Sequence, residues 1–173
     1  DDEIANISKE LGAQVPFLRP KKYASDTASS VSALQHAVKF MEKRDNTRFD
    51  IVVELMCTNP LKLCSDIDAT INKLIETDAD SVIAVHELEE HHPARIKKIV
   101  DDKITDFAVE EPNEARRQDL KPYAYIRNGS IYAISRNTLK KYKSKIGKIS
   151  RPYIMPDERS INIDEKIDFL IAE

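Results

Sequence analysis

The run Ile51-Val52-Val53-Glu54-Leu55-Met56 decides the fold class. It is short and mostly apolar, which is typical of a strand buried on both faces of a parallel sheet. The run ends at Thr58-Asn59-Pro60. Because α/β sheets bind ligands just beyond the carboxyl ends of such strands, we expect a functional loop at residues 58–60.

A helix and a second strand follow this run. Asp66 can cap a helix that extends to residue 77, and residues 81–85 form the next apolar run. A strand–helix–strand unit of this kind implies a right-handed crossover. Further helices are expected at residues 1–11, 31–43 and 164–172. The pattern predicts one α/β domain over residues 1–173, with a largely parallel sheet and helices on both faces.

Two other segments resemble hairpins. Residues 95–100 and 104–109 flank Asp101-Asp102-Lys103 and predict a peripheral hairpin. Residues 123–126 and 130–133 are β-like runs joined through Arg127-Asn128-Gly129, where Asn-Gly is a strong turn signal. From the residues alone, the second segment is either an ordinary hairpin with solvated arginines or a place where guanidinium and amide groups meet an anion.

Composition excludes several classes of protein. Lys and Arg number 27 and Asp and Glu 30, so the net charge of −3 gives no electrostatic basis for general nucleic-acid binding. The apolar runs are too short for a membrane span. Cys57 and Cys64 lack metal-site spacing, which favours reduced thiols in the cytoplasm. The three glycines are scattered, so no phosphate-cradling loop is visible.

Several stretches together resemble one family. Arg116-Arg117-Gln118, followed after a spacer by Asn128-Gly129-Ser130-Ile131-Tyr132, resembles the sugar-binding segment of the CMP-acylneuraminate (sialic acid) cytidylyltransferases. Further stretches resemble the same family in its order, at residues 15–20, 24–28, 58–61, 79–85, 92–93 and 160–164. The resemblance covers nearly the whole chain and implies a Rossmann-like nucleotide-diphospho-sugar transferase fold.

The resemblance also implies an activity. Such enzymes transfer CMP from CTP to a sialic-acid-like (nonulosonic) sugar acid and release pyrophosphate. They act as Mg²⁺-dependent homodimers, so residues 94–135 are expected to include the dimerisation hairpin and part of the sugar site. The family's Gly-rich, basic nucleotide loop is not found here, so we expect this chain alone to be inactive. The alternative is a non-catalytic remnant that binds a sugar or a partner subunit, without nucleic acid or membrane.

Candidate site residues follow from the matched motifs. The resemblance implies that the acceptor sugar is bound by Arg117, Gln118, Asn128 and Tyr132, although Tyr132 is equally suited to core packing. Thr58 and Asn59 are candidates for further substrate contacts. The preceding Met56 departs from the family, which typically has Gln at that position.

The metal candidates lie near the end of the chain. Asn162 and Asp164 are spaced to share one side of an extended segment, and Mg²⁺ prefers such hard oxygen ligands. The resemblance implies that Asp164 is the catalytic metal ligand and that Asn162, where the family has Asp, assists it. The alternative is that Asp164 caps the last helix while Asp168 faces solvent.

Overall fold

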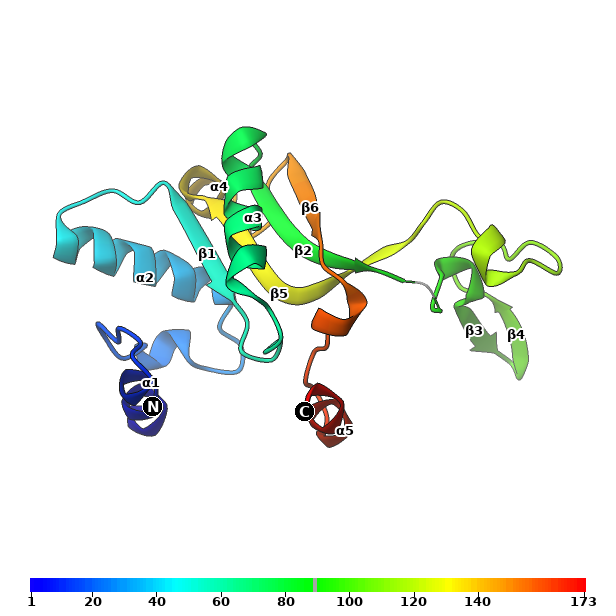
Figure 1. Ribbon diagram of the computed structural model, residues 1–173, viewed down its shortest axis with the longest axis horizontal. Coiled ribbons are helices and arrows are strands. Elements are labelled where there is room, and N and C mark those ends of the chain that lie inside the picture. Colours follow the sequence, from blue (N-terminus) through cyan, green and yellow to red (C-terminus); the bar gives the residue numbers. More distant parts are fainter. Residues whose placement is uncertain (89) are drawn as a thin grey trace.

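A four-stranded sheet forms the centre of the computed structural model, which describes residues 1–88 and 90–173 (Figure 1). The strands, in their order across the sheet, are β1 (Ile51–Leu55), β5 (Tyr125–Ser135), β2 (Ser81–Glu87) and β6 (Ser150–Ile154). The strands predicted at residues 51–56 and 81–85 are confirmed.

The directions of the strands correct one prediction. β5 lies between β1 and β2 and pairs antiparallel with both, whereas β2 and β6 are parallel. The sheet is therefore mixed, and the expectation of a largely parallel sheet is wrong at the level of strand pairing. The crossover from β1 through α3 (Cys64–Glu76) to β2 still joins two strands of the same direction, but β5 is inserted between them.

The segment around Asn128-Gly129 is one continuous strand with a large bulge. Ile83 pairs with Tyr132 and Val85 pairs with Arg127, so residues 128–131 of β5 lie opposite Ala84 alone. Gly129 adopts a φ of +74°, which glycine accepts without steric cost. The hairpin interpretation of this segment is therefore wrong, because the Asn-Gly pair makes a bulge within the strand.

Helices cover both faces of the sheet, as predicted. On one face, Val38 of α2 (Ser30–Asp45) and Leu139 of α4 (Arg136–Lys141) pack with Ile83 and Ile134. On the other face, Leu74 of α3 packs with Val82 and Ala133. This alternation follows the period of two along each strand.

The helix ends differ from the predicted ones. α3 begins at Cys64, and Asp66 lies in its first turn, where its carboxylate accepts a hydrogen bond from the Leu63 N–H. The last helix, α5 (Lys166–Ala172), begins after Asp164 and is capped through Asp168. At the other end of the chain, α1 (Asp2–Glu10) is capped by Asp1 as expected.

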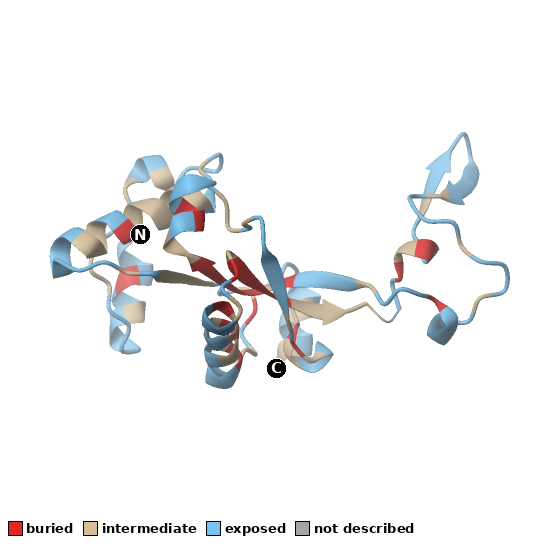
Figure 2. Cartoon of the chain, turned by 90° about the horizontal axis from the view of Figure 1, so that it is seen from above, coloured by how far each residue is buried: buried red, intermediate tan, exposed pale blue. Residues whose placement is uncertain are grey.

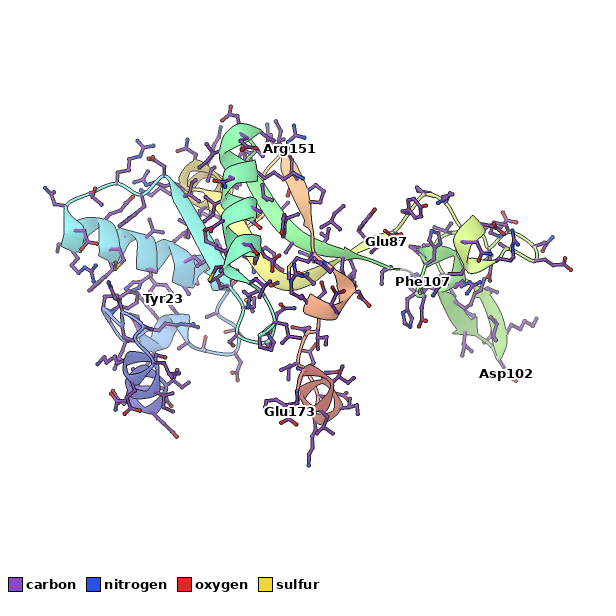
Figure 3. All side chains as sticks on the ribbon, viewed as in Figure 1. Tyr23, Glu87, Asp102, Phe107, Arg151 and Glu173 are labelled. Carbon is purple, nitrogen blue, oxygen red and sulfur yellow. The ribbon has the colours of Figure 1, made fainter. Side chains whose placement is uncertain are left out.

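Residues 90–124 form an arm that extends away from the sheet (Figure 1). The arm contains the predicted hairpin, made of β3 (Lys97–Val100) and β4 (Lys103–Asp106), and Asp102 lies at its tip (Figure 3). Most of the arm is exposed (Figure 2). Ile99 and Ile104, which pair across the hairpin, are 74% and 73% exposed. None of the described helices is long and apolar enough to cross a lipid bilayer.

Candidate functional site

Three segments meet beyond the carboxyl end of β1. The backbone N–H of Met56 donates to the carbonyl of Ser130 in the β5 bulge at 3.2 Å. The N–H of Ile163 donates to the carbonyl of Thr58 at 2.7 Å. The loop after β1, the bulge of β5 and the segment 160–164 are therefore joined through backbone hydrogen bonds, which brings together predicted site residues from distant parts of the chain.

Asn128 holds the bulge against the segment that follows β6. It is 4% exposed, and its Nδ2 donates to Ser160 Oγ at 3.0 Å and lies 3.3 Å from the sulfur of Met155. Its Oδ1 accepts from the N–H of Ser130 at 3.0 Å. Both ends of the amide thus serve internal contacts, and sugar binding by Asn128 stays a prediction.

Asn59 ties the loop after β1 to the same segment. Its side chain is fully buried, and Nδ2 donates to the carbonyl of Ile161 at 2.8 Å. Within residues 1–88 and 90–173, neither Asn59 Oδ1 nor Ser130 Oγ has a hydrogen-bond partner, although both atoms are buried. A buried polar atom without a partner costs about 1–3 kcal/mol, so these two atoms lower the stability of the loop after β1 and of the β5 bulge.

Lys62 closes this loop, and no motif in the sequence pointed to it. Its Nζ donates to the carbonyl of Met56 at 2.8 Å and also to the carbonyl of Asn59. Burial lowers the pKa of Lys62, while the nearby Cys57 acts in the opposite direction. The ammonium group therefore stabilises the turn that carries Thr58 and Asn59, through charge-assisted hydrogen bonds.

Asp164 and Asn162 lie together on the surface at the end of the joined segment. Asn162 Nδ2 donates to Asp164 Oδ2 at 2.6 Å. The helix-capping role instead belongs to Asp168, whose Oδ2 accepts from the N–H groups of Glu165 and Asp164, and these bonds lower the pKa of Asp168. The alternative in which Asp164 caps α5 is therefore wrong, and its carboxylate is exposed to ligands.

These two residues fit a magnesium ion that is shared with phosphate. Mg²⁺ in nucleotide-dependent enzymes usually takes one or two carboxylates, substrate phosphates and water. Asp164 supplies one exposed carboxylate, and the amide of Asn162 orients it. The part of the chain that the structure describes holds no cluster of three His, Cys, Asp or Glu side chains suited to a metal. Asp164 therefore offers one carboxylate to such an ion, and substrate phosphates and water would supply the remaining ligands.

Tyr132 belongs to the core. It is 8% exposed and packs with Val38, Ile134 and Leu139. Lys145 Nζ lies 4.2 Å from the centroid of its ring and donates to Glu54 Oε2 at 2.8 Å. The structure thus supports the core-packing interpretation of Tyr132, and a sugar contact by this residue stays a prediction.

Arg117 and Gln118 lie on the arm. They are part of a short helical turn, Arg117–Asp119, and line a pocket with Glu87, His92 and Tyr123. Arg117 Nη1 is 3.6 Å from Glu90 Oε1. The arm and α5 are apart in two perpendicular views (Figures 1 and 2). The predicted sugar residues are thus divided between the arm and β5, an inner strand of the sheet.

Comparison with known proteins supports the resemblance. No family model matches the chain. The chain is 27% identical over 172 residues to "Post-translational flagellin modification protein B" of Campylobacter coli and to "CMP-N,N'-diacetyllegionaminic acid synthase" of Campylobacter jejuni; each match covers 99% of this chain and 72% of the relative. It is 29% identical over 171 residues to "N-acylneuraminate cytidylyltransferase" of Streptococcus agalactiae, covering 98% of this chain and 40% of that protein.

These matches extend along nearly all of the chain, although it spans less than half of the streptococcal relative. The chain is therefore similar along its length to proteins named as N-acylneuraminate cytidylyltransferase and as CMP-N,N'-diacetyllegionaminic acid synthase, as the resemblance of its motifs implies.

Proposed function

We propose that the protein transfers CMP from CTP to a sialic-acid-like nonulosonic acid. In this reaction a sugar hydroxyl oxygen bonds to the α-phosphorus of CTP, the bond from that phosphorus to the β-phosphate oxygen breaks, and pyrophosphate leaves. The observation that carries the proposal is similarity along the whole chain to proteins named as N-acylneuraminate cytidylyltransferases and a CMP-legionaminic acid synthase.

Asp164 would hold Mg²⁺, with Asn162 keeping the carboxylate oriented. When bound, Mg²⁺ would neutralise the negative charge of the phosphates, which is the main requirement of nucleotidyl transfer. The support for this assignment is that Asp164 is exposed and is not used as a helix cap, while the segment that carries it is joined to the loop after β1.

The sugar acid would be bound partly by the arm. The guanidinium of Arg117 offers paired donors that suit a carboxylate, and the amide of Gln118 suits hydroxyl groups. The arm lies apart from the segment that carries Asp164 within one chain. Arg117 and Gln118 can therefore take part only if the arm of one chain meets the Asp164 segment of a second chain, which a two-fold pairing of chains can provide. We therefore include a homodimer in the proposal, with a pairing element within residues 94–135, a range that contains most of the arm.

The exposed apolar side chains of the arm support this pairing. Ile99, Ile104 and Phe107 are 74%, 73% and 61% exposed, and large exposed apolar groups close together are typical of protein interfaces. Sedimentation of the wild type and of Ile99→Asp/Ile104→Asp tests it. A wild-type mass of one chain at micromolar concentration would contradict the homodimer.

The exposed thiols Cys57 and Cys64 are free, which favours a reducing compartment such as the cytoplasm.

The activity is tested in the protein at its natural length. Pyrophosphate release is measured with CTP, UTP, ATP and GTP, each with N-acetylneuraminate, a legionaminate or a neutral hexose. We expect release with CTP and a nonulosonic acid, and its loss on removal of Mg²⁺ with EDTA. Preference for another nucleotide, or equal use of the neutral hexose, would overturn the proposal.

A further inference from the structure

A buried carboxylate lies behind the candidate site. Asp66 is 1% exposed, and its carboxylate accepts hydrogen bonds from several protein donors in place of water. Arg159 approaches with Nη2 at 2.8 Å and Nε at 3.3 Å, the hydroxyl of Tyr153 lies at 3.0 Å, and the N–H of Leu63 lies at 2.8 Å. The carboxylate is thus fully enclosed by donors from three separate parts of the chain.

These donors keep Asp66 charged. Burial raises its pKa, but the hydrogen bonds from Arg159, the Leu63 N–H and Tyr153 outweigh burial and leave the pKa below its usual range. Burial and the bond to Asp66 raise the pKa of Tyr153, so the phenol remains a donor. A charged carboxylate that faces fixed donors holds them in one geometry, because moving any of them away would leave the charge unsatisfied.

Two of the held segments lead directly into the site. Leu63 ends the loop that carries Thr58 and Asn59, and Arg159 immediately precedes the segment 160–164. The two segments are bonded to each other through the Ile163 N–H and the Thr58 carbonyl, and through Asn59. Asp66 therefore fixes the base of both segments at the point from which they extend toward Asp164.

We propose that Asp66 is a positioning residue for the Asp164 site, acting through Arg159 and the Leu63 N–H to set the position of Asp164 and hence the affinity for Mg²⁺. This inference rests on the proposed function for its metal readout. Residues that orient a metal ligand without touching the metal typically change metal affinity by about 10–100-fold when replaced.

The chain offers a matched control. Arg136 Nη2 donates to Glu42 Oε2 at 3.0 Å, and the Glu42 and Arg136 side chains are 15% and 18% exposed. This pair joins α2 to α4 on the opposite face of the sheet from α3. Glu42→Gln therefore breaks a partly buried ion pair without affecting the segments that carry Thr58 and Asp164.

The test uses the full-length protein with Asp66→Asn, Arg159→Gln, the double variant and Glu42→Gln, all assayed below their melting temperatures. We expect Asp66→Asn and Arg159→Gln each to raise the Mg²⁺ concentration for half-maximal rate about tenfold. The double variant should need no more Mg²⁺ for half-maximal rate than either single variant, because the two residues act as one unit. Glu42→Gln should stay within about twofold of the wild type even if its melting temperature falls.

A second readout does not need activity. Amide hydrogen exchange at Ile163, whose N–H is bonded to Thr58, should become at least about tenfold faster in Asp66→Asn and Arg159→Gln but not in Glu42→Gln. If the wild type shows no Mg²⁺-dependent CMP transfer, the proposed function fails and exchange alone decides the positioning role. Unchanged exchange at Ile163 overturns the inference, as does an unchanged Mg²⁺ requirement in an active enzyme.

Discussion

Asp164→Asn separates a metal ligand from an ordinary surface residue. The substitution keeps the size and one acceptor oxygen, so Asn162 can still donate as it does at 2.6 Å in the wild type. The cap of α5 is made by Asp168 and is not affected. We therefore expect the melting temperature to change by less than about 2 °C, as for other exposed sites without a special backbone or packing role.

The effect on rate should be much larger. Asp164 is the formal negative charge of the proposed Mg²⁺ site, and losing one preorganised electrostatic contact lowers kcat by about 10²-fold, or about 2.7 kcal/mol in the activation free energy. The assay is pyrophosphate release from CTP and a nonulosonic acid by the full-length protein, measured over a Mg²⁺ titration beside a thermal melt.

Asp168→Asn is the matched control, because it makes the same chemical change four residues away. Its side chain, at the third residue of α5, accepts from the N–H groups of Glu165 and Asp164, and an amide oxygen at that position can accept the same bonds. We expect this variant to retain its rate within about threefold. An active, Mg²⁺-responsive Asp164→Asn enzyme would refute the metal assignment, and so would equal loss of rate in both variants.

Three further predictions concern metal affinity, packing and pH. Asn162→Asp should lower the Mg²⁺ concentration for half-maximal rate several-fold, roughly threefold or more, because Mg²⁺ prefers anionic oxygen; an unchanged or raised requirement would contradict this. Gly147→Ala places a Cβ 2.0 Å from the Cβ of Asp80 and should cost about 1–3 kcal/mol in the free energy of unfolding, measured with urea. Because the folded pKa of Asp66 is depressed, its contribution to stability is present above about pH 4 and is lost as pH falls through the folded pKa. Urea unfolding from pH 6 to 2 should therefore show a steeper acid loss in the wild type than in Asp66→Asn.

The sequence predicted the elements better than their arrangement. Apolar periodicity located β1, β2, α2 and α3, because helices and strands that pack on a core must repeat their apolar residues. It carried no information on the direction of β5. Strand direction depends on partners far along the chain, and Asn128-Gly129 has the same local signature in a bulge as in a turn.

For the candidate site too, the local sequence located residues but not their long-range contacts. Motif order indicated Asn128, Asn59 and Asp164, but whether an amide faces a ligand or the interior depends on its tertiary partners. Asn128 is bonded to Ser160, 32 residues away, and Asn59 to the carbonyl of Ile161, 102 residues away. From the sequence, Asp66 is interpreted as a simple helix cap. Its bond to Arg159 could not be predicted locally, because the two residues are 93 positions apart. Local signals therefore found the residues, and only the fold assigned their contacts.

The antiparallel strand, which the sequence did not predict, is what gives the candidate metal segment its support. With β5 between β1 and β2, its bulge meets the loop after β1, and Asn128 reaches Ser160. A Cβ on Gly129 would lie 3.9 Å from Asn162 Oδ1, an ordinary contact distance, so the φ of +74° and not lack of space is the reason for glycine there. If β1 and β2 were direct neighbours in a parallel sheet, no bulge would lie under residues 160–164. The mixed sheet and the bond between Asn128 and Ser160 are therefore consequences of one feature, the insertion of β5.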